Sequence, residues 1–308
     1  MGKIAVLINP SAGRGRAVRE IGGLTGFLRK YGIDHDSVVT GSEEELRAVT
    51  REFSKKYGIM AGAGGDSTFH IMANEILNVG GESSLGMIPL GSSNDIAKEF
   101  GVETVEKACR ALKKGESRGI DVGCIVEGDK ILRYFLGQAN IGLGALVNQY
   151  VERLVARSPH LGSRQTPAGI LGIRNSFRSG KLPLLLKVSS DKDGLEGEFL
   201  LAVFSNIRYW ATGRMICPEA VVDDGRLDAC LIGKSSFLRL VRLAGMVKEG
   251  RHRGAKEVHA LQSPCFEVSS ETPFEIQTDG EILGGAEHPE MFDKVRFDVL
   301  PRALDVVC

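Results

Sequence analysis

The fold is decided by one stretch of the sequence, Gly58-Ile59-Met60-Ala61-Gly62-Ala63-Gly64-Gly65-Asp66-Ser67-Thr68, in which a short apolar run ends in a cluster of glycines. The residues that follow have the spacing of one buried helical face, with apolar side chains at Phe69, Met72, Ala73, Ile76 and Leu77. A strand, a glycine turn and a helix in this order bring backbone N–H groups close to a phosphate. Asp66 would repel that phosphate unless a divalent cation lay between them. The stretch therefore predicts a site for a metal-bound nucleotide.

Length and composition indicate an ordinary globular protein. A chain of 308 residues favours two domains, and 43% apolar with 25% charged residues is enough for sizeable cores. The net charge of zero gives no reason to expect nucleic acid as a partner. No segment approaches the roughly 18 apolar residues of a membrane-spanning helix. We therefore expect a cytoplasmic protein without a transmembrane segment, whose membrane contact would be peripheral. The six cysteines lack metal-ligand spacing and predict reduced thiols.

Strands and helices alternate through the first 124 residues. Apolar runs predict further strands at 4–8, 37–39, 85–89 and 120–123, separated by helices at about 17–31, 42–57, 96–100 and 104–114. This order predicts a doubly wound α/β domain, whose ligands bind beyond the carboxyl ends of the strands. Four loops fall at that edge and hold Asn9, Thr40, Asp66 and Asp95.

The pattern changes after about residue 124. Strands are predicted at 184–189, 199–204, 226–232, 265–269 and 273–278, with helices at about 146–156, 167–178 and 236–248. A mostly antiparallel second domain with inserted helices is expected. His252 and His259 fall in a polar loop and are predicted to lie at the surface.

Each candidate site residue also has a simpler interpretation. Asp66 and Asn94-Asp95 precede helices, where such side chains commonly cap the helix. Asp279-Gly280-Glu281 has the composition of a tight turn between strands. The glycine turn has Ser67 where a dinucleotide fingerprint has its third glycine, which disfavours a dinucleotide-dependent oxidoreductase. It also lacks the Gly-Lys-Ser/Thr of a Walker loop.

Five motifs, in this order along nearly the whole chain, resemble those of the diacylglycerol kinase catalytic-domain family, in particular the soluble bacterial lipid kinases. They are Asn9-Pro10-Ser11-Ala12-Gly13, Gly64-Gly65-Asp66-Ser67-Thr68, Pro89-Leu90-Gly91-Ser92-Ser93-Asn94-Asp95, the segment from Met215 to Asp228, and Asp279-Gly280-Glu281. The family is related to sphingosine kinases and, more distantly, to NAD kinases. One such match would be weak, but five in the right order are strong.

The resemblance implies two domains that meet at a cleft. Residues 1–124 would form the nucleotide-binding α/β domain, residues 125–289 a β-sandwich-like lipid-substrate domain, and residues 290–308 would return to the first domain. The implied reaction is ATP- and Mg²⁺-dependent transfer of the γ-phosphoryl group to the hydroxyl of a diacylglycerol-like lipid at the membrane surface. Whether the protein forms a homodimer is left open by the sequence.

The resemblance also implies roles for individual residues. Glu281 would be the general base, with Asp279 close by. The nucleotide would contact Asn9, Thr40, Gly64, Gly65, Asp66, Ser67, Thr68, Ser92, Asn94 and Asp95. Asp66 and Asp95 would arrange the catalytic Mg²⁺. A separate structural cation would bind Asp224 and the backbone oxygens of Val221 and Arg226.

Two departures from the family pattern leave alternatives open. Ser67 replaces a glycine, which would cost roughly 1–2 kcal/mol if the backbone there has positive φ. His70-Ile71 stand where the family has Asn-Glu. The alternatives are a soluble-substrate kinase such as an NAD kinase, which should not need an apolar lipid slot, and a non-catalytic relative. Retention of Asp66, Asp95, Asp279 and Glu281 argues against the non-catalytic alternative.

Overall fold

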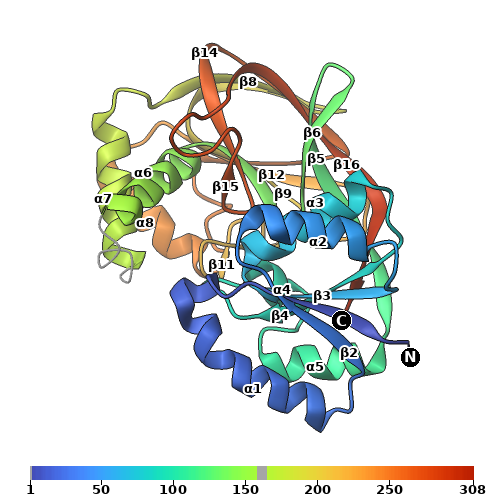
Figure 1. Ribbon diagram of the computed structural model, residues 1–308. Coiled ribbons are helices and arrows are strands. Elements are labelled where there is room, and N and C mark those ends of the chain that lie inside the picture. The colour runs from blue at the N-terminus through green and yellow to red at the C-terminus, as the bar shows by residue number, and fades with distance from the viewer. Residues whose placement is uncertain (1, 158–164) are drawn as a thin grey trace.

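A parallel sheet covered by helices forms the first part of the chain, in a computed structural model that describes residues 2–157 and 165–308 (Figure 1). Its strands are β1 (Ile4–Ile8), β2 (His35–Val39), β3 (Ile59–Gly64) and β4 (Ser84–Pro89), in the order β4-β3-β1-β2. The helical segments are η1 (Ala12–Gly15), α1 (Arg16–Lys30), α2 (Glu43–Phe53), α3 (Asp66–Asn78), α4 (Asp95–Glu99) and α5 (Val105–Lys114). The apolar runs of β1, β3 and β4 are buried along nearly their whole length, whereas β2 lies at the sheet edge and is half-exposed. The predicted doubly wound arrangement is confirmed.

The second part is mainly antiparallel, as expected. Its strands are β5 (Ser117–Glu127), β6 (Lys130–Phe135), β7 (Gln138–Gly142), β8 (Leu184–Ser189), β9 (Gly194–Ser205), β10 (Tyr209–Trp210), β11 (Arg214–Met215), β12 (Leu227–Gly233), β13 (Val258–Ser263), β14 (Cys265–Thr278), β15 (Glu281–Ile282) and β16 (Met291–Val307). Three helices, α6 (Leu143–Arg157), α7 (Gln165–Arg178) and α8 (Phe237–Val247), lie together on one side of these strands (Figure 1). The core includes Phe204 and Phe297, whose rings stack 4.3 Å apart.

One strand replaces two that the sequence predicts. The segments 265–269 and 273–278 belong to the single strand β14, whose register along β16 shifts between Ser269 and Phe274. Before the shift β14 pairs with β8, and after it β14 pairs with β7. The irregularity therefore lets one strand serve two neighbours, and the polar residues that look like a turn in the sequence mark this bend.

The last strand connects the two parts of the molecule. β16 pairs with β14 along its first half, and with β5 from Arg296 to Leu300 and again from Leu304 to Val307. Near its end Val306 lies parallel to Leu85 of β4, so one hydrogen-bonded sheet runs through both parts. The expected division near residue 124 falls within β5, a strand that borders both parts.

The surface position predicted for His252 is wrong. Its side chain is fully buried, with Nε2 3.0 Å from the Ile216 carbonyl oxygen and 3.6 Å from Cys230 Sγ. Burial lowers the pKa of His252, so the neutral ring is favoured. A polar loop sequence did not reveal this because the contact partners are distant in the chain.

Two further expectations concern reduced thiols and membrane-spanning helices. All six cysteines are free thiols. In the ranges 2–157 and 165–308, no helix has the length and apolar character that crossing a bilayer requires.

Candidate active site

The loops at the carboxyl ends of the parallel strands hold one another in place. Asn9, which follows β1, donates from Nδ2 to Thr68 Oγ1 at 3.0 Å, and its backbone N–H donates to Ala63. Thr40, which follows β2, is buried and donates from Oγ1 to the Ile8 carbonyl at 3.3 Å. The structure thus brings the predicted residues Asn9, Thr40 and Thr68 to one edge of the sheet.

Two glycine loops touch at this edge. The backbone N–H groups of Leu90 and Gly91 both donate to the Gly64 carbonyl, at 2.7 and 3.0 Å. A Cβ atom added at Gly91 would lie 2.4 Å from the Cα of Gly65, so the close approach of the loops itself requires glycine. Asn94 adopts a left-handed backbone (φ 55°). Its side chain accepts from the Gly91 N–H and donates to the Gly91 carbonyl, both at 3.0 Å. Ser92 is exposed at the tip of its loop.

Asp66 and Asp95 form a chain of contacts from one loop to the next. The Asp66 carboxylate accepts hydrogen bonds from the N–H groups of Asp95 and Ile96, at 3.1 and 3.0 Å, and so caps α4. The Asp95 carboxylate accepts from the N–H groups of Thr212 and Gly213, which belong to the second part of the molecule. Burial, together with the neighbouring charge of Asp95, raises the pKa of Asp66 to about 7. Burial also raises the pKa of Asp95.

This pair fits a catalytic Mg²⁺. Two buried carboxylates with raised pKa values repel each other when ionised, and a divalent cation beside them would relieve that repulsion. Proteins commonly bind Mg²⁺ through one or two carboxylates and the phosphates of a substrate. Asp66 and Asp95 would supply those two ligands.

The loop predicted to hold a structural cation is already well bonded. Asp224 accepts from Arg226 N–H at 3.0 Å and from Gln262 Nε2 at 3.2 Å, and Asp121 accepts from Gly225 N–H at 2.6 Å. Among the described residues no group of three or more His, Cys, Asp or Glu side chains could hold a metal ion. Backbone oxygens of Val221 and Arg226 would have to complete such a site, and the structural cation stays a prediction.

The turn that carries Glu281 lies against the start of α3. Ser67 Oγ donates to Glu281 Oε1 at 2.5 Å, which brings together residues 214 positions apart. The described residues offer no hydrogen bond or ion pair to the second oxygen, Glu281 Oε2.

Asp279 is engaged differently from Glu281. Its backbone is left-handed (φ 47°) and its buried carboxylate accepts from the N–H groups of Leu136, Gly137 and Gln138, at 2.7, 2.8 and 2.9 Å. His70 Nδ1 lies 3.0 Å from the same carboxylate. Every position at which this carboxylate readily accepts a hydrogen bond is therefore occupied.

Several residues at this site were not predicted. His70 and Asn74 follow Ser67 on the same face of α3, and Asn74 exchanges two 3.0 Å hydrogen bonds with the backbone of Tyr134. On α6, Asn148 Nδ2 donates to the Gly280 carbonyl at 2.5 Å and to Glu152 at 2.9 Å. Burial and the charge of Glu281 raise the pKa of Glu152 to about 7. Only the helical spacing of 67, 70 and 74 was visible in the sequence; their partners were not.

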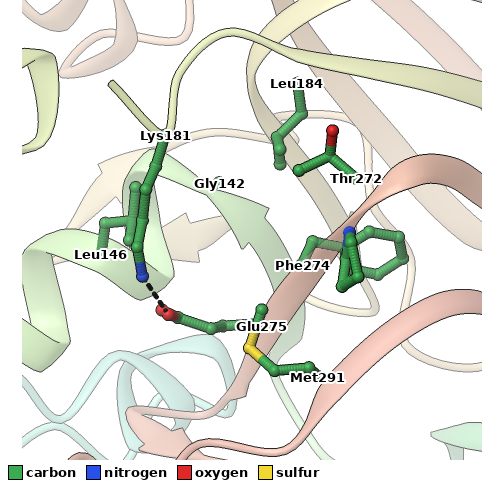
Figure 2. A pocket seen from close by; sticks show the side chains of 9 residues that line it. Gly142, Leu146, Lys181, Leu184, Thr272, Phe274, Glu275 and Met291 are labelled. Carbon is green, nitrogen blue, oxygen red and sulfur yellow. Dashed lines mark hydrogen bonds and ion pairs between the residues drawn. The ribbon is translucent and has the colours of Figure 1, made fainter. Parts of the chain in front are cut away.

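A pocket of about 160 Å³ opens in the second part of the molecule (Figure 2). Its wall is mainly apolar and is formed by Gly142, Leu146, Leu184, Pro273, Phe274 and Met291, with Lys181, Thr272 and Glu275. The ion pair between Lys181 Nζ and Glu275 Oε1, at 2.7 Å, crosses one side of it. The sequence alone does not indicate this pocket, because its residues come from four separate segments, 142–146, 181–184, 272–275 and 291.

Comparison with known proteins matches both parts of the chain. Residues 3–125 match the diacylglycerol kinase catalytic domain, and residues 137–308 match the YegS C-terminal NAD kinase beta sandwich-like domain. A diacylglycerol kinase of Mycobacterium tuberculosis is 29% identical over 287 residues, covering 92% of this chain and 89% of that protein. A "Probable lipid kinase YegS-like" protein of Pseudomonas aeruginosa is 28% identical over 273 residues, covering 87% of this chain and 82% of that protein.

A solved structure shares the fold. A diacylglycerol kinase from Bacillus anthracis superposes with a TM-score of 0.71 at 17% identity, over 99% of this chain and 96% of that chain.

Proposed function

Because the chain belongs to the lipid kinase family that joins a diacylglycerol kinase catalytic domain to a YegS C-terminal domain, we propose that it phosphorylates the hydroxyl of a diacylglycerol-like lipid with ATP and Mg²⁺. One observation carries the proposal: the Glu281 carboxylate lies 2.5 Å from Ser67, in the turn where the phosphates would bind. Phosphoryl transfer needs donors on the phosphates, a cation and a carboxylate for the acceptor's proton. The site offers residues suited to each of these three roles.

The contacts of each residue suggest its role in the reaction. The start of α3 presents backbone N–H groups and the positive end of the helix dipole to the phosphates, where Gly64 and Gly65 lack side chains that would block them. Asp66 and Asp95 would hold Mg²⁺, which would neutralise phosphate charge when bound. Glu281 Oε2 accepts the proton of the lipid hydroxyl while the hydroxyl oxygen bonds to the γ-phosphorus of ATP. The bond between the γ-phosphorus and the β,γ-bridging oxygen breaks, and ADP is released.

Asp279 has a different role in this proposal. Its carboxylate is buried and accepts three backbone hydrogen bonds besides the contact with His70. A carboxylate so occupied fixes the turn and leaves proton transfer to Glu281.

The pocket supports a lipid over a soluble dinucleotide as substrate. Its apolar wall suits part of an acyl chain, and NAD has no comparable apolar group to bury there. The Asn148 contact with Gly280 links α6, which also contributes Leu146 to the pocket, to the turn of Glu281.

The assay that tests this function measures phosphate transfer from labelled ATP to diacylglycerol, to other lipids and to NAD. We expect transfer to the lipid, and a loss of kcat of about 100-fold or more in Glu281→Gln and Asp66→Asn. Lipid phosphorylation that survives both substitutions would contradict the site. Turnover of NAD alone would identify a soluble-substrate kinase, and intact ATP binding without any turnover would identify a non-catalytic relative.

We also propose that α7 and α8 form the surface that contacts the membrane. Leu238, Val241 and Leu171 expose 80%, 54% and 46% of their surface, and Phe237, which packs edge-on against Phe177, is also exposed. Arg174 and Arg178 on α7, Arg242 on α8 and Lys248, which follows α8, are exposed basic side chains. Neither helix contains an acidic residue. Exposed apolar side chains among basic ones suit a bilayer with anionic headgroups.

Vesicle sedimentation tests this surface. The double variant Leu238→Glu, Val241→Glu should lose binding to phosphatidylglycerol-containing vesicles while it still phosphorylates a short-chain, water-soluble diacylglycerol. Ile131→Glu, at an exposed position in the β5–β6 hairpin, is the matched control and should bind as the unaltered protein does. Equal vesicle binding by all three proteins would contradict the assignment.

A further inference from the structure

The backbone of the turn that bears Glu281 is held without any help from Glu281 itself. Asp279 is fixed by three backbone N–H groups and by His70. The Gly280 carbonyl accepts from Asn148 on α6. What these contacts leave undetermined is the direction of the Glu281 carboxylate, which stands at the end of a flexible side chain.

Ser67 supplies the missing restraint from a rigid element. It lies in the first turn of α3 and is partly buried, with Oγ directed at Glu281 Oε1. The helix is itself anchored at two positions that follow Ser67. Thr68 accepts from Asn9, and Asn74 pairs with the backbone of Tyr134. A glycine at position 67 would have no side chain with which to reach the carboxylate.

We propose that Ser67 is a positioning residue for Glu281: its hydroxyl donates to Oε1 and directs Oε2 at the acceptor hydroxyl. This inference rests on the proposed function, in which Glu281 is the base. It assigns a role to the residue that distinguishes this chain from the Gly-Gly-Asp-Gly-Thr pattern. The hydrogen bond also spans the two parts of the molecule, so the base is in place only when α3 and β15 are together.

The test compares Ser67→Ala, Ser67→Thr and Glu281→Gln in the full chain, with diacylglycerol and ATP varied separately. We expect Ser67→Ala to lower kcat about tenfold, while KM for ATP and for lipid each stay within about twofold. Ser67→Thr keeps the hydroxyl and should restore most of the lost kcat. A merely structural role would not give this separation of kcat from KM together with rescue by threonine.

Thr104→Ala is the matched control for stability. Thr104 is another hydroxyl residue at a helix start, where it caps α5 far from Glu281 in the described structure, and its loss should lower the melting temperature without changing kcat. Ser67→Ala should lower the melting temperature no more than this control does.

Three outcomes would overturn the inference. In the first, Ser67→Ala keeps the full kcat although Glu281→Gln is inactive, which leaves the proposed function standing. In the second, the loss in Ser67→Ala appears as a higher KM for ATP, which would make the hydroxyl a nucleotide contact. In the third, ATP without lipid adds a phosphoryl group to Ser67, detected by intact mass and peptide mapping, which would make it an acceptor. Activity that survives in Glu281→Gln would remove the proposed base as well, and would thereby separate failure of the function from failure of Ser67 alone.

Discussion

Ser67 keeps an ordinary right-handed backbone, so the replacement of the family's glycine does not strain the turn. Gly65, two residues earlier, caps α3 with an extended conformation (φ −109°), and Ser67 is the second residue of the helix. Left-handed residues occur nearby at Asn94 and Asp279. Both are stabilised by their own side-chain hydrogen bonds, to Gly91 and to the amides of residues 136–138. These two left-handed residues therefore belong to motifs that the chain shares with the family.

Glu152 allows a prediction about pH at the same scale. Burial, then the charge of Glu281, raises the pKa of Glu152 to about 7, so the folded state favours the protonated carboxyl. The stability that this raised pKa contributes is fully present below the pKa of a glutamate in the unfolded chain, about 4.3. It is lost as the pH rises through the folded-state pKa of about 7. Glu152→Gln removes this pH-dependent contribution to stability, because glutamine does not titrate. Its melting temperature relative to the unaltered protein should therefore rise by about 1–3 °C between pH 5 and pH 8.5.

Thermal unfolding without nucleotide or lipid measures this difference. Glu82→Gln, at an exposed position, is the control and should differ from the unaltered protein by the same amount at both pH values. A Glu152→Gln difference that is constant with pH would contradict the prediction.

At the scale of elements, α3 carries more than the apolar face that the sequence reveals. Residues from Thr68 to Ile76 are all buried, including His70, Asn74 and Glu75. Glu75 pairs with Arg47 at 2.9 Å and Arg51 at 3.2 Å, both on α2. Buried polar groups must be paired, and the partners of these three side chains include Asp279 for His70, Tyr134 for Asn74 and the two arginines for Glu75. The helix thus fixes its neighbours through polar contacts as well as apolar ones.

The packing of the two glycine loops gives a prediction at this scale. Gly91→Ala would place Cβ 2.4 Å from Gly65 Cα and 2.7 Å from Asn94 Oδ1, which forces the loops apart. We expect a loss of about 1–3 kcal/mol in the free energy of unfolding and weaker ATP binding. Denaturant titration and nucleotide-binding calorimetry measure the two effects.

Gly22→Ala is the control for replacing a glycine by alanine at a position where the added Cβ has space. Gly22 lies within α1, and an added Cβ would meet nothing within 4 Å. Alanine there should stabilise the protein by about 0.5–1 kcal/mol through its higher helix propensity, and should leave ATP binding unchanged. Similar effects of the two substitutions would show that loop packing does not decide the response at Gly91.

At the scale of the whole molecule, β16 makes the two parts one hydrogen-bonded sheet. Val306 is fully buried, and it is paired with Leu85 on one side and Arg118 on the other. Removing its methyl groups should lower the free energy of unfolding by about 2 kcal/mol in Val306→Ala. Because the strand belongs to both parts, we expect one cooperative transition, shifted as a whole.

Differential scanning calorimetry checks this expectation. Val39→Ala, at a half-exposed position of the edge strand β2, should change the free energy of unfolding by no more than about 0.5 kcal/mol. Two separate transitions in Val306→Ala would contradict the coupling of the two parts through β16.

The sequence by itself determined the elements of the first part, the antiparallel character of the second and the family. These follow from local periodicity, glycine turns and motif order, which short stretches of chain carry on their own. Even the loops of Asn9, Thr40, Asp66 and Asp95 could be placed at one edge, since parallel strands end together.

Only the tertiary structure decided which side chains meet. The contacts of Ser67 with Glu281, of His70 with Asp279 and of Asn74 with Tyr134 join residues 60 to 214 positions apart. The apolar pocket and the burial of His252 likewise depend on separate segments packing together. Such contacts arise from the relative placement of elements, for which periodicity along one stretch of chain carries no information.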